Sequence, residues 1–220
     1  MLLDLHNHTR YSPDSRVSPA DLVTAAQRAG LAGVAITDHN SIAGVRDAQE
    51  AARESFLVIP GIEVSTRSGH VLGYGVRDVV PRGLSVRETA ERIISAGGVP
   101  VAAHPYRFWS GLGDVGLAET SFPAYETRNG RTLRRGNERA HERARALHVG
   151  ETGGSDSHFL DEIAKAVTAI DAGELPLDDV LQQLGQGKTT AQGTDRGAGA
   201  TVRYVTKAVS EWIGRGMRRI

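Results

Sequence analysis

Gly33-Val34-Ala35-Ile36-Thr37 is a continuous apolar run that leads directly into Asp38-His39. Such a run is typical of a strand buried on both faces of a parallel sheet. Helices are predicted on either side of it, over residues 18–29 and 42–54, the first because Ser18-Pro19 suits an N-cap and first turn. The segment therefore predicts a β-α-β unit whose strand ends in polar side chains.

The same alternation continues along the first two thirds of the chain. Further strands are predicted over residues 2–5, 56–59, 71–76, 99–103, 124–126 and 166–170, and helices over 85–96, 137–147, 177–184 and 204–212. Pro60-Gly61 is expected to bend the chain after its strand, and the glycine-rich residues 186–201 are expected to form a loop. Repeated β-α-β units predict an α/β fold, either an open doubly wound sheet or a closed barrel. No G-x-G-x-x-G or P-loop motif follows the first strand, which disfavours the nucleotide-binding open sheets.

The composition restricts the chemistry. The 220 residues include no cysteine and eight histidines, with 26 basic and 26 acidic side chains. Disulfides, thiolate nucleophiles, cysteine-bound zinc and iron–sulfur clusters are therefore excluded, so any metal must be held by His, Asp or Glu. A net charge of zero also disfavours a bulk nucleic-acid coat or a polybasic membrane binder.

Hydrophobic segments for targeting or membrane insertion are not evident. The first residues meet a charge at Asp4, too early for a signal peptide. No stretch approaches the ~18 apolar residues of a membrane span. We therefore expect a cytoplasmic location and no membrane partner.

Polar side chains gather directly after the predicted strands. They are His6 and His8 after the first strand, Asp38 and His39 after the second, Glu63 after the third, His104 after the fifth, and Asp156 and His158 after a later one. The carboxyl ends of parallel strands share one rim, where active sites assemble. Residues at i and i+2 of an extended segment project from the same face, which applies to both paired motifs. Imidazole and carboxylate without thiolate suit Zn, Mn or Fe.

Each motif alone has an ordinary interpretation. Asp38 could cap the next helix, Glu63 could be a surface charge, and His141 and His148 are interpreted as solvated or packed side chains of a helix. The motifs taken together predict a metal site.

Several motifs resemble those of the PHP (polymerase and histidinol phosphatase) superfamily. They are His6-Asn7-His8, Thr37-Asp38-His39-Asn40, Pro60-Gly61-Ile62-Glu63, Gly69-His70-Val71-Leu72-Gly73-Tyr74, Ala103-His104-Pro105 and Gly154-Ser155-Asp156-Ser157-His158, in family order. The resemblance implies a distorted seven-stranded (β/α)7 TIM-like barrel over residues 1–175. Residues 176–220 resemble the PHP-associated C-terminal region and are expected to form a helical extension packed on the barrel.

The resemblance also implies two to three divalent metal ions in the barrel mouth. The first would take His6, His8, Glu63 and Asp156, the second would share Glu63 and add His70 and His104, and the third would take Asp14, His39 and His158. His70 is unusual in this set because it precedes its predicted strand.

A hydrolase of this kind would attack phosphorus with a metal-bound hydroxide, since close divalent ions lower the pKa of water. Asp38 is expected to orient a ligand or a water. Arg107 is expected to hold the substrate phosphate, because Arg binds phosphate in bidentate fashion, and Asn129 and Arg131 are further candidates for substrate contact. Residues 128–145 carry seven Arg and two Glu, a basic flank that suits a nucleotide or short oligonucleotide.

The leading hypothesis is a metal-dependent phosphoesterase acting on a small phosphorylated metabolite or a nucleotide. The alternatives are a 5′-directed exonuclease on short RNA or DNA, a phosphatase of the histidinol-phosphate type, a metal hydrolase of another bond such as an amide, and a non-catalytic metal-binding regulatory module. The apolar side chains within residues 204–213 would dock on the barrel or on a second subunit, which leaves a homodimer open.

Overall fold

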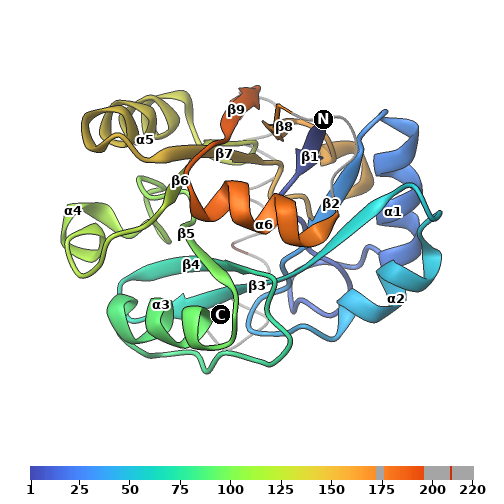
Figure 1. The fold of residues 1–220 in the computed structure, drawn as a ribbon, viewed down its shortest axis with the longest axis horizontal. Helices are drawn as coiled ribbons and strands as arrows, with labels where there is room; N and C mark the ends of the chain where they lie inside the picture. Colours follow the sequence, from blue (N-terminus) through green and yellow to red (C-terminus); the bar gives the residue numbers. More distant parts are fainter. Residues whose placement is uncertain (172–175, 196–208, 210–220) are drawn as a thin grey trace.

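The computed structural model describes residues 1–171, 176–195 and 209 (Figure 1). Its strands are β1 (Leu2–Asp4), β2 (Gly33–Ile36), β3 (Leu57–Thr66), β4 (Gly69–Tyr74), β5 (Val99–Ala102), β6 (Ala124–Asn129), β7 (Gly150–Gly154), β8 (Ala166–Ala169) and β9 (Thr190–Gly193). Its helices are α1 (Pro19–Arg28), α2 (Gly44–Ala51), α3 (Val86–Ser95), α4 (Gly113–Leu117), α5 (Arg134–Leu147) and α6 (Leu177–Gly185), with a 3₁₀ turn at Leu160–Glu162.

The strands form one sheet in the order β7-β6-β5-β4-β3-β2-β1-β8-β9. β1 to β3 are parallel to one another, as are β5 to β7, whereas β4 runs antiparallel to both of its neighbours. The sheet curls until β7 meets the other end, where Leu5 N–H donates to Gly153 O at 3.4 Å and Glu151 N–H to Thr189 O at 3.2 Å. The expected α/β barrel is therefore confirmed, and the described residues give it nine strands where seven were expected.

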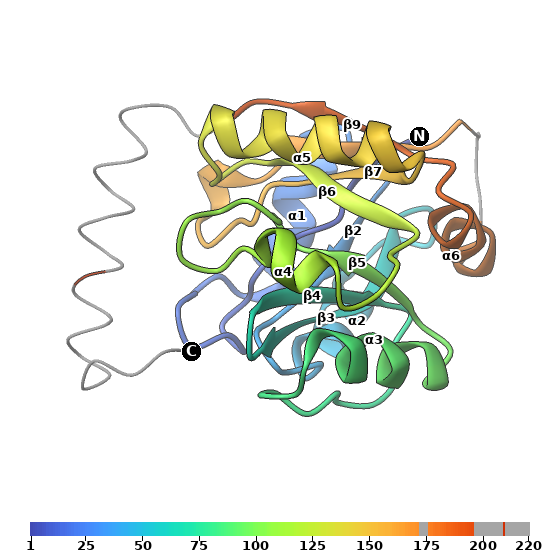
Figure 2. The same ribbon diagram turned by 90° about the vertical axis from the view of Figure 1, so that its left-hand side faces the viewer.

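Helices surround this curled sheet. Figures 1 and 2 show α1, α2, α3 and α5 around its outside, and α6 lying across the end of the barrel that faces the viewer in Figure 1. Val180 and Leu184 of α6 are fully buried and join the interior cluster that contains Leu3, Leu72 and Val101. Residues 176–193 thus share the barrel core, and the boundary at residue 175 remains a prediction.

Two local expectations were wrong. β3 continues through Pro60 without ending, because Pro60 stays in register with Ile36 and its carbonyl accepts from Gly75 N–H at 2.7 Å. Glu63 therefore lies within a strand. β9 forms inside the stretch expected to be a loop, because the edge of β8 offers it four paired positions from Ala166 to Ala169. The helix predicted over 204–212 lies outside the described residues, apart from residue 209.

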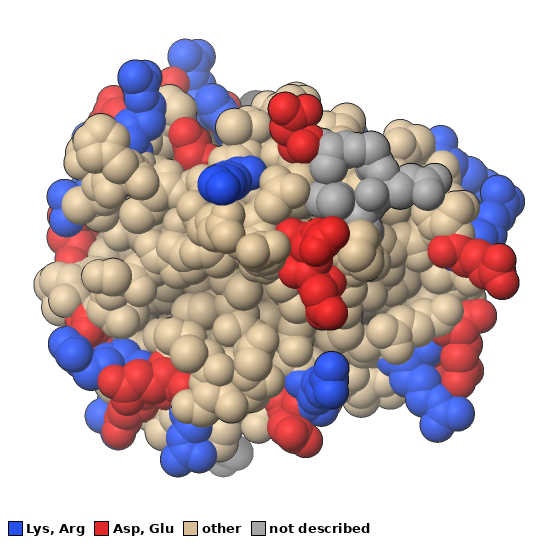
Figure 3. Space-filling model, viewed as in Figure 1, with Lys and Arg blue, Asp and Glu red and all other residues tan. Residues whose placement is uncertain are grey.

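Charged side chains are spread around the periphery of the face seen in Figure 3, and an acidic group lies near its middle. Within the part of the chain that the structure describes, no helix has the length and hydrophobicity to cross a bilayer.

Candidate metal centre

The nine side chains expected to ligate metal come together at one end of the barrel. His6 and His8 follow β1, His39 follows β2, Glu63 lies in β3, His70 in β4, His104 follows β5, Asp156 and His158 follow β7, and Asp14 lies in the loop after His8. All but Asp14 and His70 are classed as buried, and those two are partly buried. Such a concentration of buried ionisable groups is tolerated only when they are paired or hold a metal.

Glu63 is the centre of this cluster. Its two carboxylate oxygens lie 2.7–3.3 Å from a nitrogen of each of five imidazoles, those of His6, His8, His39, His70 and His104. A carboxylate with two oxygens and about four lone-pair sites cannot accept five good hydrogen bonds. More imidazole nitrogens surround this carboxylate than it can bind, and nitrogen atoms placed in this way suit metal coordination.

Four overlapping sets of donor atoms could each hold an ion. In each set the atoms lie within 4.8 Å of one another: His8, Asp14, His39 and His158; His6, His104 and Asp156; His6, His8 and Glu63; and His39, Glu63 and His70. Glu63, His6, His8 and His39 each belong to two of these sets, so neighbouring ions would share ligands.

The place of His70 follows from strand direction. β4 is antiparallel to β3, with His70 opposite Ser65 and Leu72 opposite Glu63. The start of β4 therefore lies at the same rim as the carboxyl ends of the parallel strands. The His70 Nδ1 atom lies 2.7 Å from Glu63 Oε1.

The backbone of the rim is held in uncommon conformations. Asp156 and His104 have φ values of 53° and 27°, a region that non-glycine residues rarely occupy. Asp156 N–H donates to His6 O at 2.7 Å, and Ser157 Oγ donates to Asn7 Oδ1 at 2.8 Å. These bonds join the ends of β1 and β7 and fix both ligand pairs, in keeping with strain being concentrated at functional sites.

Glu126 is a site residue that the sequence reasoning missed. The Nδ1 atom of His6 lies 2.9 Å from its Oε1, and its Oε2 accepts from His104 N–H at 2.7 Å and from Asn129 Nδ2 at 3.1 Å. A carboxylate in this position fixes the tautomer and orientation of a ligating histidine. The sequence signal for it was a charged side chain, Glu126, within the strand predicted over residues 124–126, where buried side chains are normally apolar.

Asp38 and Ser12 hold the segments that carry His8 and His39. Asp38 accepts from the Thr9 backbone N–H at 2.6 Å and from Thr9 Oγ1 at 2.7 Å. It does not cap α2, whose N-cap is Ala43 without a side-chain bond. Ser12 Oγ lies 3.0 Å from His8 Nδ1 and accepts from His39 N–H at 2.8 Å. The Asp38 carboxylate thus binds Thr9 through both of its oxygens.

Two guanidinium groups reach the cluster. Arg107 contacts the Asp156 carboxylate and donates to Asn129 Oδ1 at 2.9 Å, while Arg131 contacts His158 Nδ1. Asn129 is fully buried, and both ends of its amide are hydrogen-bonded, to Asp156 at 3.2 Å and to Arg131 N–H at 3.0 Å among others. Asn129 therefore positions the charged groups around it, and its expected contact with the substrate stays a prediction.

The pKa values of four imidazoles are shifted, two of them upward and two downward. Burial by itself would lower the pKa of His8, but hydrogen bonds to Asp156 and Glu63 raise it to about 9. Burial would lower the pKa of His6 as well, and the charges of Glu126, Asp156 and Glu63 raise it well above its usual value. Burial lowers the pKa of both His104 and His158 to about 3, aided by Arg107 and Arg131 respectively.

The donor chemistry fits divalent cations. The Nε2 atoms of His6 and His8 lie 3.2 Å apart, and both lie 3.3 Å from Glu63 Oε2. Without a cation these contacts are favourable only when imidazoles take up protons, as the raised pKa values of His6 and His8 indicate. His104 Nδ1 is also buried without a hydrogen-bond partner among the described residues. A divalent ion would replace the protons and satisfy the converging nitrogens.

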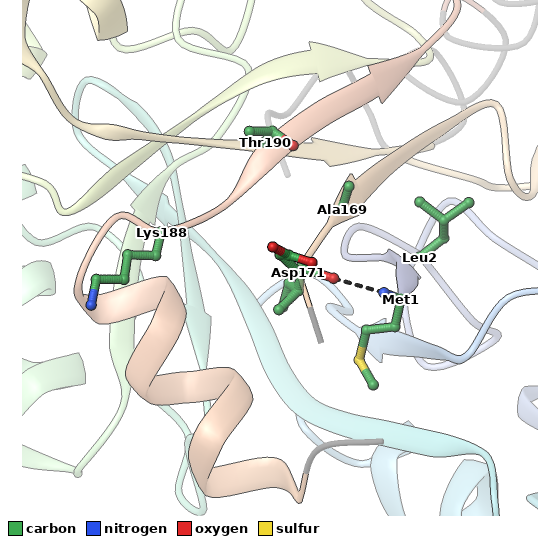
Figure 4. A pocket seen from close by; sticks show the side chains of 7 residues that line it. Met1, Leu2, Ala169, Asp171, Lys188 and Thr190 are labelled. Carbon is green, nitrogen blue, oxygen red and sulfur yellow. Dashed lines mark hydrogen bonds between the residues drawn. The ribbon is translucent and has the colours of Figure 1, made fainter. Parts of the chain in front are cut away.

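A separate cavity of about 340 Å³ lies at the opposite end of β1 and carries no such cluster (Figure 4). Met1, Leu2, Ala169, Ile170, Asp171, Lys188 and Thr190 line it. The amino group of Met1 donates to Ile170 O at 2.7 Å there.

Comparison with known protein families shows which family the chain belongs to. A family model described as PHP domain matches residues 4–153. The chain belongs to the PHP domain family. A second model, described as PHP-associated, matches residues 134–189 of this PHP protein. The resemblance of its motifs to the PHP superfamily is thus confirmed.

Relatives of the PHP protein include an uncharacterized protein and two proteins named as enzymes. It is 38% identical over 117 residues to the uncharacterized protein MJ1587 of Methanocaldococcus jannaschii, covering 48% of this chain and 68% of that protein. It is 37% identical over 84 residues to a 5′-3′ exoribonuclease of Haemophilus influenzae, covering 36% and 30% of the two chains. It is 33% identical over 84 residues to a 3′,5′-nucleoside bisphosphate phosphatase of Chromobacterium violaceum, covering 36% and 29%. The chain thus spans under a third of either enzyme.

The fold is shared with solved structures. A two-domain protein of Bacteroides vulgatus, described as containing a predicted PHP-like metal-dependent phosphoesterase, superposes with a TM-score of 0.73 at 20% identity. The match covers 88% of the PHP protein and 64% of that chain.

Proposed function

We propose that this PHP protein is a metal-dependent phosphoesterase that hydrolyses a small phosphorylated metabolite or a nucleotide. The observation that carries the proposal is the buried Glu63 carboxylate, which is contacted by five imidazoles beside an Asp156 that Arg107 contacts. The two relatives named as an exoribonuclease and a bisphosphate phosphatase have names that denote hydrolysis of phosphoric ester bonds, which supports the same class of reaction for this chain.

Two to three Zn, Mn or Fe ions would be held by the nine rim side chains. His6, His8, Glu63 and Asp156 would form the first set, Glu63, His70 and His104 the second, and Asp14, His39 and His158 the third. When bound, such ions lower the pKa of a water and offset negative charge on a phosphoryl group.

The remaining polar residues prepare the site for a phosphate. Arg107 and Arg131 would bind phosphoryl oxygens, because both guanidinium groups already lie in the site. Arg107 contacts the Asp156 carboxylate and Arg131 contacts the His158 imidazole. Glu126 would keep the proton of His6 on Nδ1 and so leave Nε2 available to an ion. Asp38 would act through Thr9, by holding the segment that presents His8.

Metal content and phosphate release test the proposal together. The purified full chain is analysed for metals by mass spectrometry and then screened with nucleotides and sugar phosphates in the presence of Mn²⁺ or Zn²⁺. Two to three bound ions with phosphate release are the expected result. Stoichiometric metal without release from any of these substrates would contradict it.

A 5′-directed exonuclease is the second candidate. The observation in its favour is the basic helix α5, which carries five Arg and two Glu and starts three residues after Arg131. Short 5′-phosphorylated oligonucleotides separate the two candidates, because an exonuclease releases mononucleotides from them whereas a phosphomonoesterase releases only the terminal phosphate.

A further inference from the structure

An exposed aromatic pair lies on the loop between His104 and α4. Phe108 is 86% exposed and Trp109 is 77% exposed, and their rings meet edge to face with centroids 4.6 Å apart. Exposed apolar side chains that are contiguous mark binding sites, whereas single ones are normal on a protein surface. Phe108 is the most exposed large apolar side chain among the described residues.

The loop that carries the pair is fixed to the metal rim on two sides. Arg107 N–H donates to His104 O at 2.9 Å, and the backbone N–H of His70 donates to Ser110 O at 3.1 Å. The Cα atom of Phe108 is four residues from His104, so it lies within about 14 Å of it. The backbone that carries the two rings is therefore held near the cluster by the loop's own hydrogen bonds.

The third side of the loop rests on the basic helix. A Cβ at Gly136 of α5 would lie 3.0 Å from Tyr106 O, so the helix packs directly on the loop. The Arg139 guanidinium lies 4.2 Å from the centre of the Tyr106 ring, and Arg139 and Tyr106 both bond to Asp114. Tyr106 and Arg139 thus hold the loop in place, while the two neighbouring rings are left outside this packing.

A cation that reaches the cluster is followed in this loop by two aromatic side chains, an order that would suit the phosphate and the base of a nucleotide. Arg107 reaches Asp156 in the cluster, and Phe108 and Trp109 follow it directly in the chain. Aromatic side chains stack with nucleobases of any sequence, because every base has a π-face. We propose that Phe108 and Trp109 form a stacking platform for the nucleobase of the substrate, which makes a nucleotide the preferred substrate class. This inference rests on the proposed phosphoesterase function.

The test compares substrates with and without a base. KM and kcat of the Mn²⁺-loaded full chain are measured for adenosine 5′-monophosphate and ribose 5-phosphate. Replacing both rings with alanine, in a Phe108→Ala and Trp109→Ala double variant, should raise KM for the nucleotide by at least about fivefold and leave kcat and the sugar phosphate unaffected. Trp109→Phe should retain most of the affinity, since it keeps a ring. Val115→Ala, which alters an exposed apolar side chain on α4, is the matched control and should change neither substrate.

A binding measurement keeps the inference separate from catalysis. Adenosine 5′-methylenephosphonate has a C–P bond that a phosphoesterase cannot cleave, and methylphosphonate lacks the base. Calorimetry should show that the double variant binds adenosine 5′-methylenephosphonate more weakly than the unaltered protein does, and that both bind methylphosphonate equally. If no substrate is hydrolysed but this difference is seen, the proposed function fails while the platform stands.

Three results would overturn the platform. They are an unchanged KM for the nucleotide in the double variant, an equal loss on both substrates, and a change in molar mass by light scattering with unchanged nucleotide binding, which would indicate a subunit contact. A 5′-phosphorylated trinucleotide shows whether the stacked base belongs to a free nucleotide or to the end of a strand. If the double variant raises KM more for the trinucleotide than for the mononucleotide, the base belongs to the end of a strand. The reverse result indicates a free nucleotide.

Discussion

Replacing Glu126 with glutamine should weaken metal binding without removing any ligand. Glu126 Oε2 accepts two donors, His104 N–H at 2.7 Å and Asn129 Nδ2 at 3.1 Å, so the glutamine oxygen must occupy that position. The glutamine NH₂ then faces His6 Nδ1, which lies 2.9 Å from the other carboxylate oxygen. The opposite orientation would place the NH₂ against two buried donors, which costs more.

The consequence for His6 is a change of tautomer. With an NH₂ facing it, Nδ1 must accept, so the proton moves to Nε2. Nε2 is the atom that faces Glu63 at 3.3 Å and Asp156 at 3.9 Å, and a protonated nitrogen cannot ligate a metal. Loss of a carboxylate partner of a ligating histidine costs about 10- to 100-fold in metal affinity, or about 1.4–2.8 kcal/mol.

The assay is a competition titration of Mn²⁺ or Zn²⁺ against a fluorescent chelator, with the His6 tautomer followed by ¹⁵N NMR. Glu151→Gln is the matched control, because Glu151 lies on the adjacent strand β7 and pairs with His141 Nδ1 at 2.7 Å outside the cluster. The control should bind metal like the unaltered protein. Wild-type metal affinity in Glu126→Gln would refute the tautomer argument.

Four further predictions concern the cluster and its cations. Glu63→Gln should lower metal content and abolish phosphate release, because Glu63 contributes to two donor sets; full metal content by mass spectrometry would show that it is not shared. His39→Ala should lower metal content and turnover but keep the far-ultraviolet circular dichroism spectrum, and a spectrum of an unfolded chain would exclude a purely local role. Metal binding at pH 7.5 should release protons, measured by calorimetry in buffers of different ionisation enthalpy, because His8 has a pKa of about 9 in the metal-free protein and must be neutral to ligate. Metal affinity should therefore rise up to about pH 9, and the stability that charged His8 gives the metal-free fold should be present below its unfolded pKa of about 6.5 and lost as the pH rises through about 9. Arg107→Lys should raise KM for the substrate about tenfold, since lysine lacks the bidentate fork, whereas exposed Arg143→Lys should not.

The chemistry of the candidate site could be predicted from residues that are adjacent in the chain. The absence of cysteine left imidazole and carboxylate as the strong ligands, and an apolar run followed by a polar pair, as at Ile36 to His39, predicts a strand that ends at the rim. The helix before β2 follows from capping and periodicity, since Ser18 caps α1 at Asp21 N–H as predicted. These features depend on interactions within a few residues, which a sequence displays directly.

Contacts between distant segments were decided by the tertiary structure. Glu126 binds His6 across 120 positions of the chain, and no local pattern marks that pairing. β9 exists because β8 leaves an edge open, although its own glycine-rich sequence favours a loop. The two ends of the Asn129 amide bind Arg107 and Asp156, which only the three-dimensional packing brings together.

The sequence by itself determined which side chains could bind metal and that they follow strands, because both properties belong to residue type and local periodicity. Strand direction was left to the fold. His70 precedes the strand predicted over residues 71–76 and seemed misplaced for a rim ligand, yet it lies at the start of β4, which runs antiparallel to β3, so this start is beside Glu63. Direction is set by which neighbouring strands offer matching backbone hydrogen bonds, and only the assembled sheet contains that information.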